Sequence, residues 1–342
     1  MKTTSVILAL SLPTAIAGDS IPTISDCITK DSGAKVCRFP EIDLNGPSIA
    51  LRFEGEDAVI YCVKTEQRDP NSWHGECYGS DNDANFVQIF DADGKTTIFG
   101  SIHIGEDSCQ IAPNHVGDLE MECNPYSAFE DEWEADDLDD EDDSRHLVAT
   151  DAVFAMSKSN NLRRRLQTDY DDGKTLDLMV LWTKSAECGY SGMSYPCDLT
   201  AATEARMRNL ITLAVSVTDD AFSLSGIDAK IRVVHAYRHE TYEEPSSNSW
   251  NTMAVQLRND NDGHMDDVHG KRVLYGADLV HMISSATGSC GVGYVGPNKN
   301  RMFSISRYTC AVANFSFGHE LGKSAVKEMT YISTNLFFEI SP

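Results

Sequence analysis

The segment FSFGHELG, residues 315–322, carries a histidine followed directly by a glutamate. In the pattern His-Glu-x-x-His on a helix, both histidines lie on one face and reach one metal ion, while the glutamate meets the metal-bound water. His319 and Glu320 supply the first two members, and Lys323 takes the place of the second histidine. A lysine ammonium has no lone pair to offer and repels Zn²⁺. The segment therefore predicts a helix with the start of a zinc motif and a cation where a ligand is required.

The sequence upstream of this segment alternates strand and helix patterns. Leu176–Thr183, with the sequence LDLMVLWT, is mostly apolar and predicts a buried strand. Within Thr200–Phe222, apolar residues recur at three- and four-residue spacing and predict a helix with one buried stripe. The other expected elements are a strand over Lys230–Tyr237, helices over Trp250–Leu257 and Met265–Tyr275, the latter capped by Asp266 and Asp267, and strands over Ala277–Ile283 and Met302–Ser306. This order predicts an α/β domain with a mostly parallel sheet covered by helices.

The region from Leu176 to Gly322 resembles the secreted reprolysin-like metzincins, the adamalysin class of zinc metalloproteases. The stretches that carry the resemblance are LDLMVLWT, LITLAVSVTDDAFSLSGI, IRVVHAYR, DDVHGKRVLYGADLVHMI, the Cys-Gly-Val-Gly loop and FSFGHELG. The resemblance implies a metzincin-like α/β catalytic domain with a mixed twisted sheet. It also implies zinc as the cofactor and proteins or peptides as the substrates.

The full motif of that family is HExxHxxGxxH, with three zinc-binding histidines and a general-base glutamate above a Met-turn. Transferred residue by residue, the resemblance makes His319 the first zinc ligand and Glu320 the base. Lys323 stands at the second ligand position, Val326 at the glycine and Met329 at the third ligand. No Met-turn follows, and we expect the lower subdomain to be missing. Because one histidine does not hold zinc in a defined geometry, we expect negligible peptidase activity.

The match to the family ends at Gly322. The codons of Gly322-Lys323-Ser324 can read GGT-AAG-TCN, which contains GTAAGT, the consensus start of a spliceosomal intron. We therefore hypothesise that residues 323–342 are a divergent tail translated from an intron.

The first seventeen residues have the features of a signal peptide. Lys2 precedes the apolar run Val6–Leu12, and Ala15-Ile-Ala17 forms a small-x-small cleavage pattern. A short buried helix is the alternative interpretation. No later run approaches the roughly 20 apolar residues of a membrane span. We therefore expect a secreted, extracellular protein with no membrane span.

Residues 18–127 have a strand-like pattern and predict a β-rich domain, which the resemblance makes a propeptide. Ser48–Phe53, Ala58–Val63, Phe86–Phe90 and Thr96–Ile104 are the expected strands, with the turn Asp91–Gly94 between the last two. No constellation of residues in this domain points to chemistry.

Residues 128–168 are expected to form a linker. Eleven of the fourteen residues from Glu130 to Asp143 are acidic, which is typical of a solvated, self-repelling segment. The basic run Leu162-Arg-Arg-Arg-Leu166 follows, and the bond from Arg165 to Leu166 is the candidate site of propeptide removal. A solvated basic patch that neutralises the acidic stretch is the alternative explanation. The expected peptidase-like domain then covers residues 169–322.

The ten cysteines divide six and four around this linker. An even set in a chain with a signal peptide indicates a disulfide framework. We expect Cys188 to pair with Cys197 and Cys290 with Cys310. The connectivity of the first six stays open; they are Cys27, Cys37, Cys62, Cys77, Cys109 and Cys123.

The formal net charge of −25 argues against nucleic acid as a partner, because phosphate binding draws on clustered Lys and Arg. Two further hypotheses stand beside an inactive metalloendopeptidase. One is a secreted non-catalytic binding or regulatory protein. The other is a misassembled gene product without a stable fold, which predicts poor expression and early proteolysis.

Overall fold

The computed structural model describes two parts of the chain. The first covers residues 23–125, except 31–32, 39–41, 43, 45, 54–58, 70–71, 79–83, 91–95, 105–106 and 115–116. The second covers residues 174–325, except 248 and 295–301. The predicted signal peptide, the acidic linker with Arg165 and Leu166, and the positions Val326 and Met329 lie outside the described residues.

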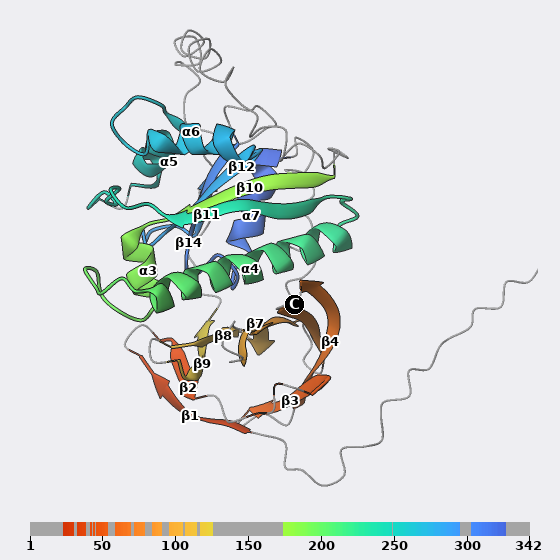
Figure 1. Ribbon diagram of the computed structural model, residues 1–342. Helices are drawn as coiled ribbons and strands as arrows, with labels where there is room; N and C mark the ends of the chain where they lie inside the picture. Colours follow the sequence, from red (N-terminus) through yellow and green to blue (C-terminus); the bar gives the residue numbers. More distant parts are fainter. Residues whose placement is uncertain are drawn as a thin grey trace, which may run out of the picture.

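The first part is a closed β-barrel, which lies beneath helix α4 of the second part in Figure 1. Its strands follow the order β1-β2-β9-β8-β7-β6-β5-β4-β3, and every neighbouring pair is antiparallel except β1 with β3. The strands are β1 (Thr23–Thr29), β2 (Lys35–Arg38), β3 (Ser48–Phe53), β4 (Val59–Asp69), β5 (Ser72–Tyr78), β6 (Ala84–Phe90), β7 (Thr96–Ile104), β8 (Asp107–Pro113) and β9 (Leu119–Pro125). The four strands expected from sequence are β3, β4, β6 and β7, and the other five were not predicted.

Apolar side chains and disulfides fill the barrel interior. Leu51, Ile102 and Ile111 are almost fully buried there, because alternate residues of each strand point inward. Disulfides join Cys27 to Cys37 and Cys109 to Cys123. Cys62, also disulfide-bonded, lies opposite Cys77 in the register of β4 and β5. No free cysteine occurs among the residues that the structure describes.

The second part is built on a five-stranded sheet of order β11-β10-β12-β14-β13. The first four strands pair in parallel, and β13 pairs antiparallel with β14 at the edge. The bounds are β10 (Thr175–Trp182), β11 (Lys230–Arg238), β12 (Leu279–Ser284), β13 (Gly291–Gly293) and β14 (Phe303–Arg307). The predicted α/β class and mixed sheet are confirmed. The short edge strand β13 was missed, because two glycines in three residues give no strand pattern.

Helices cover both faces of this sheet: α3 (Lys184–Tyr190), α4 (Ala201–Leu224), α5 (Trp250–Arg258), α6 (Asp267–Tyr275) and α7 (Ser316–Ala325). Alternate residues of β10 divide the core in two. Leu178 and Val180 face α4 and α7, while Met179 and Leu181 face α5 and α6. Figure 1 shows α5 and α6 on one side of the sheet and α4 on the other.

The prediction that Asp266 and Asp267 cap helix α6 is wrong in part. Asp266 occupies the N-cap position, but its own φ of −56° is helical and its side chain makes no capping bond. The carboxylate instead accepts hydrogen bonds from the backbone N–H groups of Asp262 and Gly263 at 3.1 and 3.2 Å. It therefore stabilises the turn before the helix. Helix α4, by contrast, begins with a reciprocal capping box between Thr200 and Thr203.

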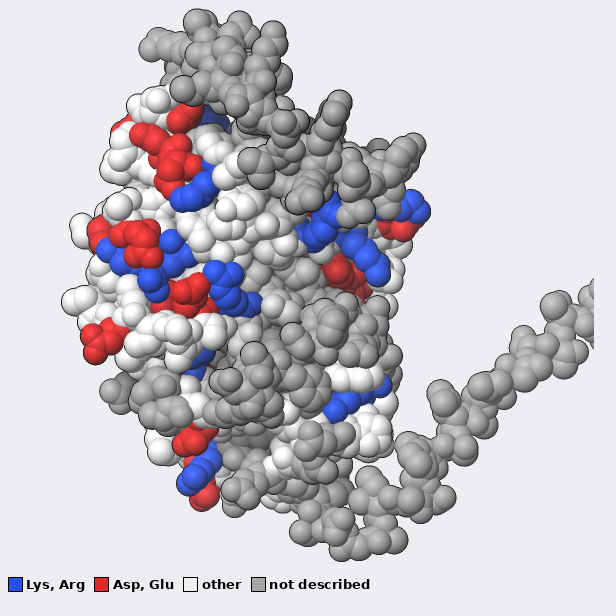
Figure 2. All heavy atoms as spheres, in the orientation of Figure 1, with Lys and Arg blue, Asp and Glu red and all other residues white. Residues whose placement is uncertain are grey.

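Charged side chains on the described surface occur mainly in mixed groups. Figure 2 shows blue and red side chains next to one another on the face that it draws. Ion pairs account for several of these groups, including Arg232 with Asp177 and Arg208 with Glu204. No helix of the described ranges is long and apolar enough to cross a membrane.

Candidate metal centre

Helix α7 places the His-Glu pair against the edge of the sheet. Phe317 and Leu321, four residues apart, are buried in the core with α4 and hold the helix in register. The carboxylate of Glu320 therefore points toward β13. A Cβ atom at Gly291 would lie 2.8 Å from Glu320 Cγ, and one at Gly293 would lie 2.6 Å from Glu320 Oε2. Both glycines are needed for this close approach of the carboxylate to the edge strand.

A disulfide ties this edge strand to the turn that begins α7. Cys290, just before β13, is bonded to Cys310 with a Cα–Cα distance of 5.4 Å. The chain then reverses at Phe315, whose φ of +54° lies in the left-handed region that few non-glycine residues adopt. The amide of His319 donates to the Phe315 carbonyl at 2.9 Å, so this residue still closes the first helical turn.

Lys323 lies on the same side of α7 as the candidate base. Its Nζ is 3.3 Å from Oε1 of Glu320, and the two side chains are 7% and 0% exposed. A buried charge is costly unless an opposite charge accompanies it, so the ammonium and the carboxylate offset the cost of each other's burial. The helix continues without a break past Gly322 to Ala325. The position of the expected second ligand is therefore filled by the ammonium partner of the carboxylate.

The described residues do not fit a zinc ion. Among the described ranges, no group of three or more His, Cys, Asp or Glu side chains is arranged to hold a metal. His319 is half-buried and supplies one imidazole, while Lys323 supplies a cation. Zinc sites in proteins require three or four uncharged or anionic donors. This donor set fails that requirement.

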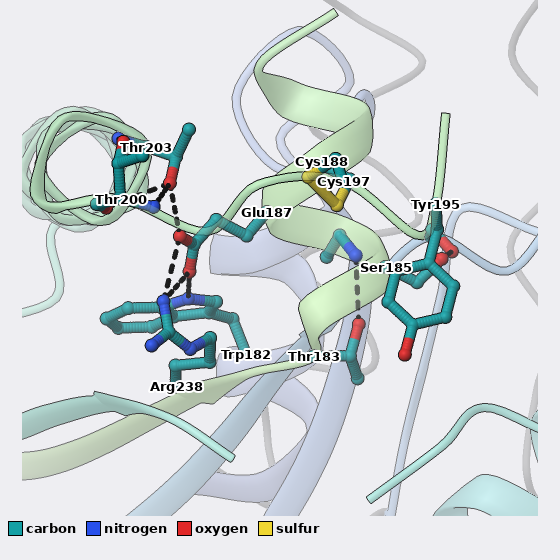
Figure 3. Close-up of a disulfide and its surroundings, with 12 residues drawn as sticks. Trp182, Thr183, Ser185, Glu187, Cys188, Tyr195, Cys197, Thr200, Thr203 and Arg238 are labelled. Atoms are coloured by element: carbon teal, nitrogen blue, oxygen red, sulfur yellow. Dashed lines mark hydrogen bonds and ion pairs between the residues drawn. A yellow bond between two sulfur atoms is a disulfide. The ribbon is translucent and has the colours of Figure 1, made fainter. Parts of the chain in front are cut away.

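The predicted disulfide between Cys188 and Cys197 lies beside a buried carboxylate that the sequence analysis missed (Figure 3). Cys188 is bonded to Cys197, which are the expected partners. Next to it, Glu187 is fully buried and accepts hydrogen bonds from Trp182 Nε1 at 2.7 Å and Thr203 Oγ1 at 2.6 Å. Arg238 Nη1 lies 3.0 Å from the same carboxylate. These partners satisfy both oxygens of the Glu187 carboxylate. The cluster therefore links α3, α4, β10 and β11, and Glu187 is not a catalytic acid.

A fully buried histidine lies under α7. His281 on β12 makes 2.8 Å hydrogen bonds through Nδ1 to Ser304 and through Nε2 to Ser306. Its ring centroid is 4.4 Å from that of Phe317. Burial lowers the pKa of His281 to about 3. The imidazole is therefore neutral and links β12 to β14 through its two hydrogen bonds. His281 was not singled out from the sequence, because one histidine in an apolar strand gives no distinct signal.

Comparisons with known proteins point to one class. Residues 207–325 match the model described as metallo-peptidase family M12B, reprolysin-like. Two curated relatives, the peptidyl-Asp metalloendopeptidases of Stenotrophomonas maltophilia and Xanthomonas campestris pv. campestris, are each 26% identical over 149 residues. The aligned stretch is 43% of this chain and 32% of each relative, so the chain spans about a third of their length.

A solved structure, metalloproteinase-II from Bacteroides fragilis, aligns with 81% of this chain and 79% of that chain. The identity is 11% and the TM-score 0.40, a level at which the likeness carries no argument. The sheet order and the helix that carries His319 and Glu320 define an α/β domain. Residues 207–325 are therefore similar to reprolysin-like metallopeptidases, and part of the chain is similar to two proteins named as metalloendopeptidases.

Proposed function

We propose that this chain is a secreted member of the metzincin class that keeps the fold of a zinc metalloendopeptidase without its activity. The observation that supports this proposal is the buried ion pair between Lys323 and Glu320. In an active metzincin, three histidines would hold a zinc ion, which would supply Lewis-acid chemistry, and the glutamate would serve as the general base. Here an ammonium pairs with that glutamate, and the described residues offer one imidazole.

We further propose the roles of the other segments. Residues 1–17 are a signal peptide, 18–127 a propeptide and 128–168 a linker that is cut between Arg165 and Leu166. The closed barrel over residues 23–125, with its own core and disulfides, supports a separate propeptide domain. Residues 169–322 then form the upper part of the peptidase domain, and its protein or peptide partners are bound without being cleaved.

A second candidate is a non-catalytic binding or regulatory protein in its own right. The same ion pair favours it, because a buried carboxylate neutralised by a lysine leaves a helix that folds without metal. Stoichiometric zinc at His319 would contradict this candidate.

The test is a joint measurement of zinc content and proteolysis on the purified full chain. After equilibrium dialysis against a limiting zinc concentration, the chain should hold well under one zinc per molecule. A denatured protein substrate should stay uncut with or without a chelator. Rapid cleavage that a chelator blocks and that Glu320→Gln abolishes would overturn the proposal. Cleavage that persists in Glu320→Gln comes from a contaminating protease.

We also propose that the tail from Lys323 is translated intron, since the family motif ends at this point. Sequencing the transcript across the codons of Gly322 and Lys323 tests it. A spliced message that continues His-x-x-Gly-x-x-His would support the proposal and define an active form. A message that reads through these codons with no spliced form would refute it.

A further inference from the structure

An aromatic side chain of the barrel completes the core of the α/β domain. Phe99 on β7 is fully buried and belongs to the same apolar cluster as Met207 and Leu210 of α4. Ala112 on β8 packs against this cluster as well. Moving a phenylalanine ring from solvent into an apolar core stabilises the contact between the two parts. The barrel therefore contributes an apolar anchor to the domain beside it.

A polar contact lies next to this anchor. His74 on β5 makes a 2.5 Å hydrogen bond through Nδ1 with Ser216 Oγ, and its Nε2 is 3.1 Å from Asp220 Oδ2. Ser216 and Asp220 are one turn apart on α4, so one imidazole spans the helical turn. Nδ1 of His74 thus pairs with the hydroxyl of Ser216, while Nε2 faces the carboxylate of Asp220.

The Ser-His-Asp composition of this contact does not make it a hydrolase site. Ser216 is 3% exposed and His74 4% exposed, so no substrate reaches the hydroxyl. A nucleophile that acts on a substrate must be accessible to the scissile bond. His74 and Ser216 instead have the character of a desolvated interface anchor, with Asp220 at its partly exposed edge.

Two further contacts join the barrel to other elements of the α/β domain. Ser108 Oγ on β8 donates to the carbonyl of Ala313 at 3.0 Å, in the turn just before α7. Gln110 Nε2 lies 3.4 Å from the hydroxyl of Tyr190 in α3. Opposite charges also interact across the interface. Burial lowers the pKa of the Arg206 guanidinium on α4, and the negative charge of Glu120 in the barrel acts against this lowering. The barrel thus holds the start of the helix that carries His319.

We propose that α4 and the turn before α7 form a docking surface for the β-barrel, and that the barrel stays bound as a separate chain after the linker is cut. Every contact named above lies outside the linker, and the described disulfides join cysteines within one part only. A buried aromatic anchor beside the buried hydrogen bond of His74 with Ser216 is the arrangement that carries most of the energy in stable interfaces. The inference depends neither on zinc nor on natural processing at Arg165.

The experiment is to insert a site for a sequence-specific protease within residues 130–143, purify the full chain and cut it. At about 1 μM, the two pieces should co-elute from a gel-filtration column, as expected for a dissociation constant well below that concentration. Separation of the wild-type pieces under native conditions would overturn the proposal. Zinc content plays no part in this readout, so the result is independent of the proposed loss of activity.

Variants locate the interface. Phe99→Ala should weaken association about 100-fold, as expected for removing a buried ring. Because this change also touches the barrel, Ser216→Ala and Asp220→Asn test the same surface from α4. Each should weaken association about tenfold. Ser223→Ala on α4 and Ile28→Ala, a barrel side chain that is 73% exposed, should leave it unchanged. Equal affinity in all five variants would contradict the proposed surface.

Discussion

Nζ of Lys323 lies 3.3 Å from Oε1 of Glu320, both side chains are buried, and Glu320 packs against the edge strand β13. The contact joins two positions that a zinc metallopeptidase would give to a metal ligand and to its general base. Its consequences for metal affinity and for stability can be measured separately.

The first prediction concerns metal affinity. Lys323→His replaces the cation by an imidazole four residues from His319, on the same helix face. We expect this variant to bind Zn²⁺ at least about tenfold more tightly than the wild type, since even outer partners of a metal ligand change affinity by 10–100-fold. Isothermal titration calorimetry checks it. Lys323→Gln is the matched control, because it removes the charge without adding a ligand. Equal zinc affinity in both variants would show that His319 does not face the metal position.

The second prediction concerns the stability of the ion pair. Lys323→Met removes one partner of a buried pair, which typically costs about 3–5 kcal/mol in the free energy of unfolding. Glu320→Gln combined with Lys323→Met removes both charges, and it should recover most of this loss. Urea unfolding of the two single variants and the double variant gives the coupling energy. A coupling energy near zero would mean that the two side chains do not interact in solution.

The third prediction concerns the buried carboxylate of Glu187 (Figure 3). Glu187→Ala takes the acceptor away from Trp182 and Thr203 and removes the counter-charge of Arg238. We expect a loss of about 3–5 kcal/mol in the free energy of unfolding. Glu204→Ala, which removes an exposed ion pair with Arg208, should cost less than about 1 kcal/mol. Denaturant unfolding monitored by tryptophan fluorescence compares them, and similar losses would contradict the structural role of Glu187.

The core elements of the α/β domain were predictable because their patterns are strong and local. The run of apolar residues in β10 and the stripe along α4 both identify an element from a few neighbouring residues. Helix α3 was missed because it has only seven residues, one of them a glycine. It is stabilised by a cap, a disulfide and the Glu187 cluster, and a local sequence pattern does not reveal these contacts. The burial of Lys323 against Glu320 was also not predictable, since it depends on β13, which approaches α7 only in the folded sheet.

The last prediction concerns the pH dependence of stability. Burial lowers the pKa of His281 to about 3, from an ordinary value of 6.5. Above pH 6.5 the ring is neutral in both the folded and the unfolded chain, so the full stability is present. Between pH 6.5 and 3 only the unfolded chain takes up the proton, and stability falls as the pH decreases, by up to about 1.4 kcal/mol per pH unit.

His281→Asn keeps a polar group between Ser304 and Ser306 but cannot take up a proton. Its free energy of unfolding should therefore fall less steeply than that of the wild type when urea unfolding is repeated from pH 6.5 down to pH 4. His264→Asn, a change at an exposed histidine, should keep the wild-type slope. If the free energy of unfolding of His281→Asn also falls with the wild-type slope, the His281 imidazole is protonated in the folded protein. The conclusion that a neutral ring links β12 to β14 would then be wrong.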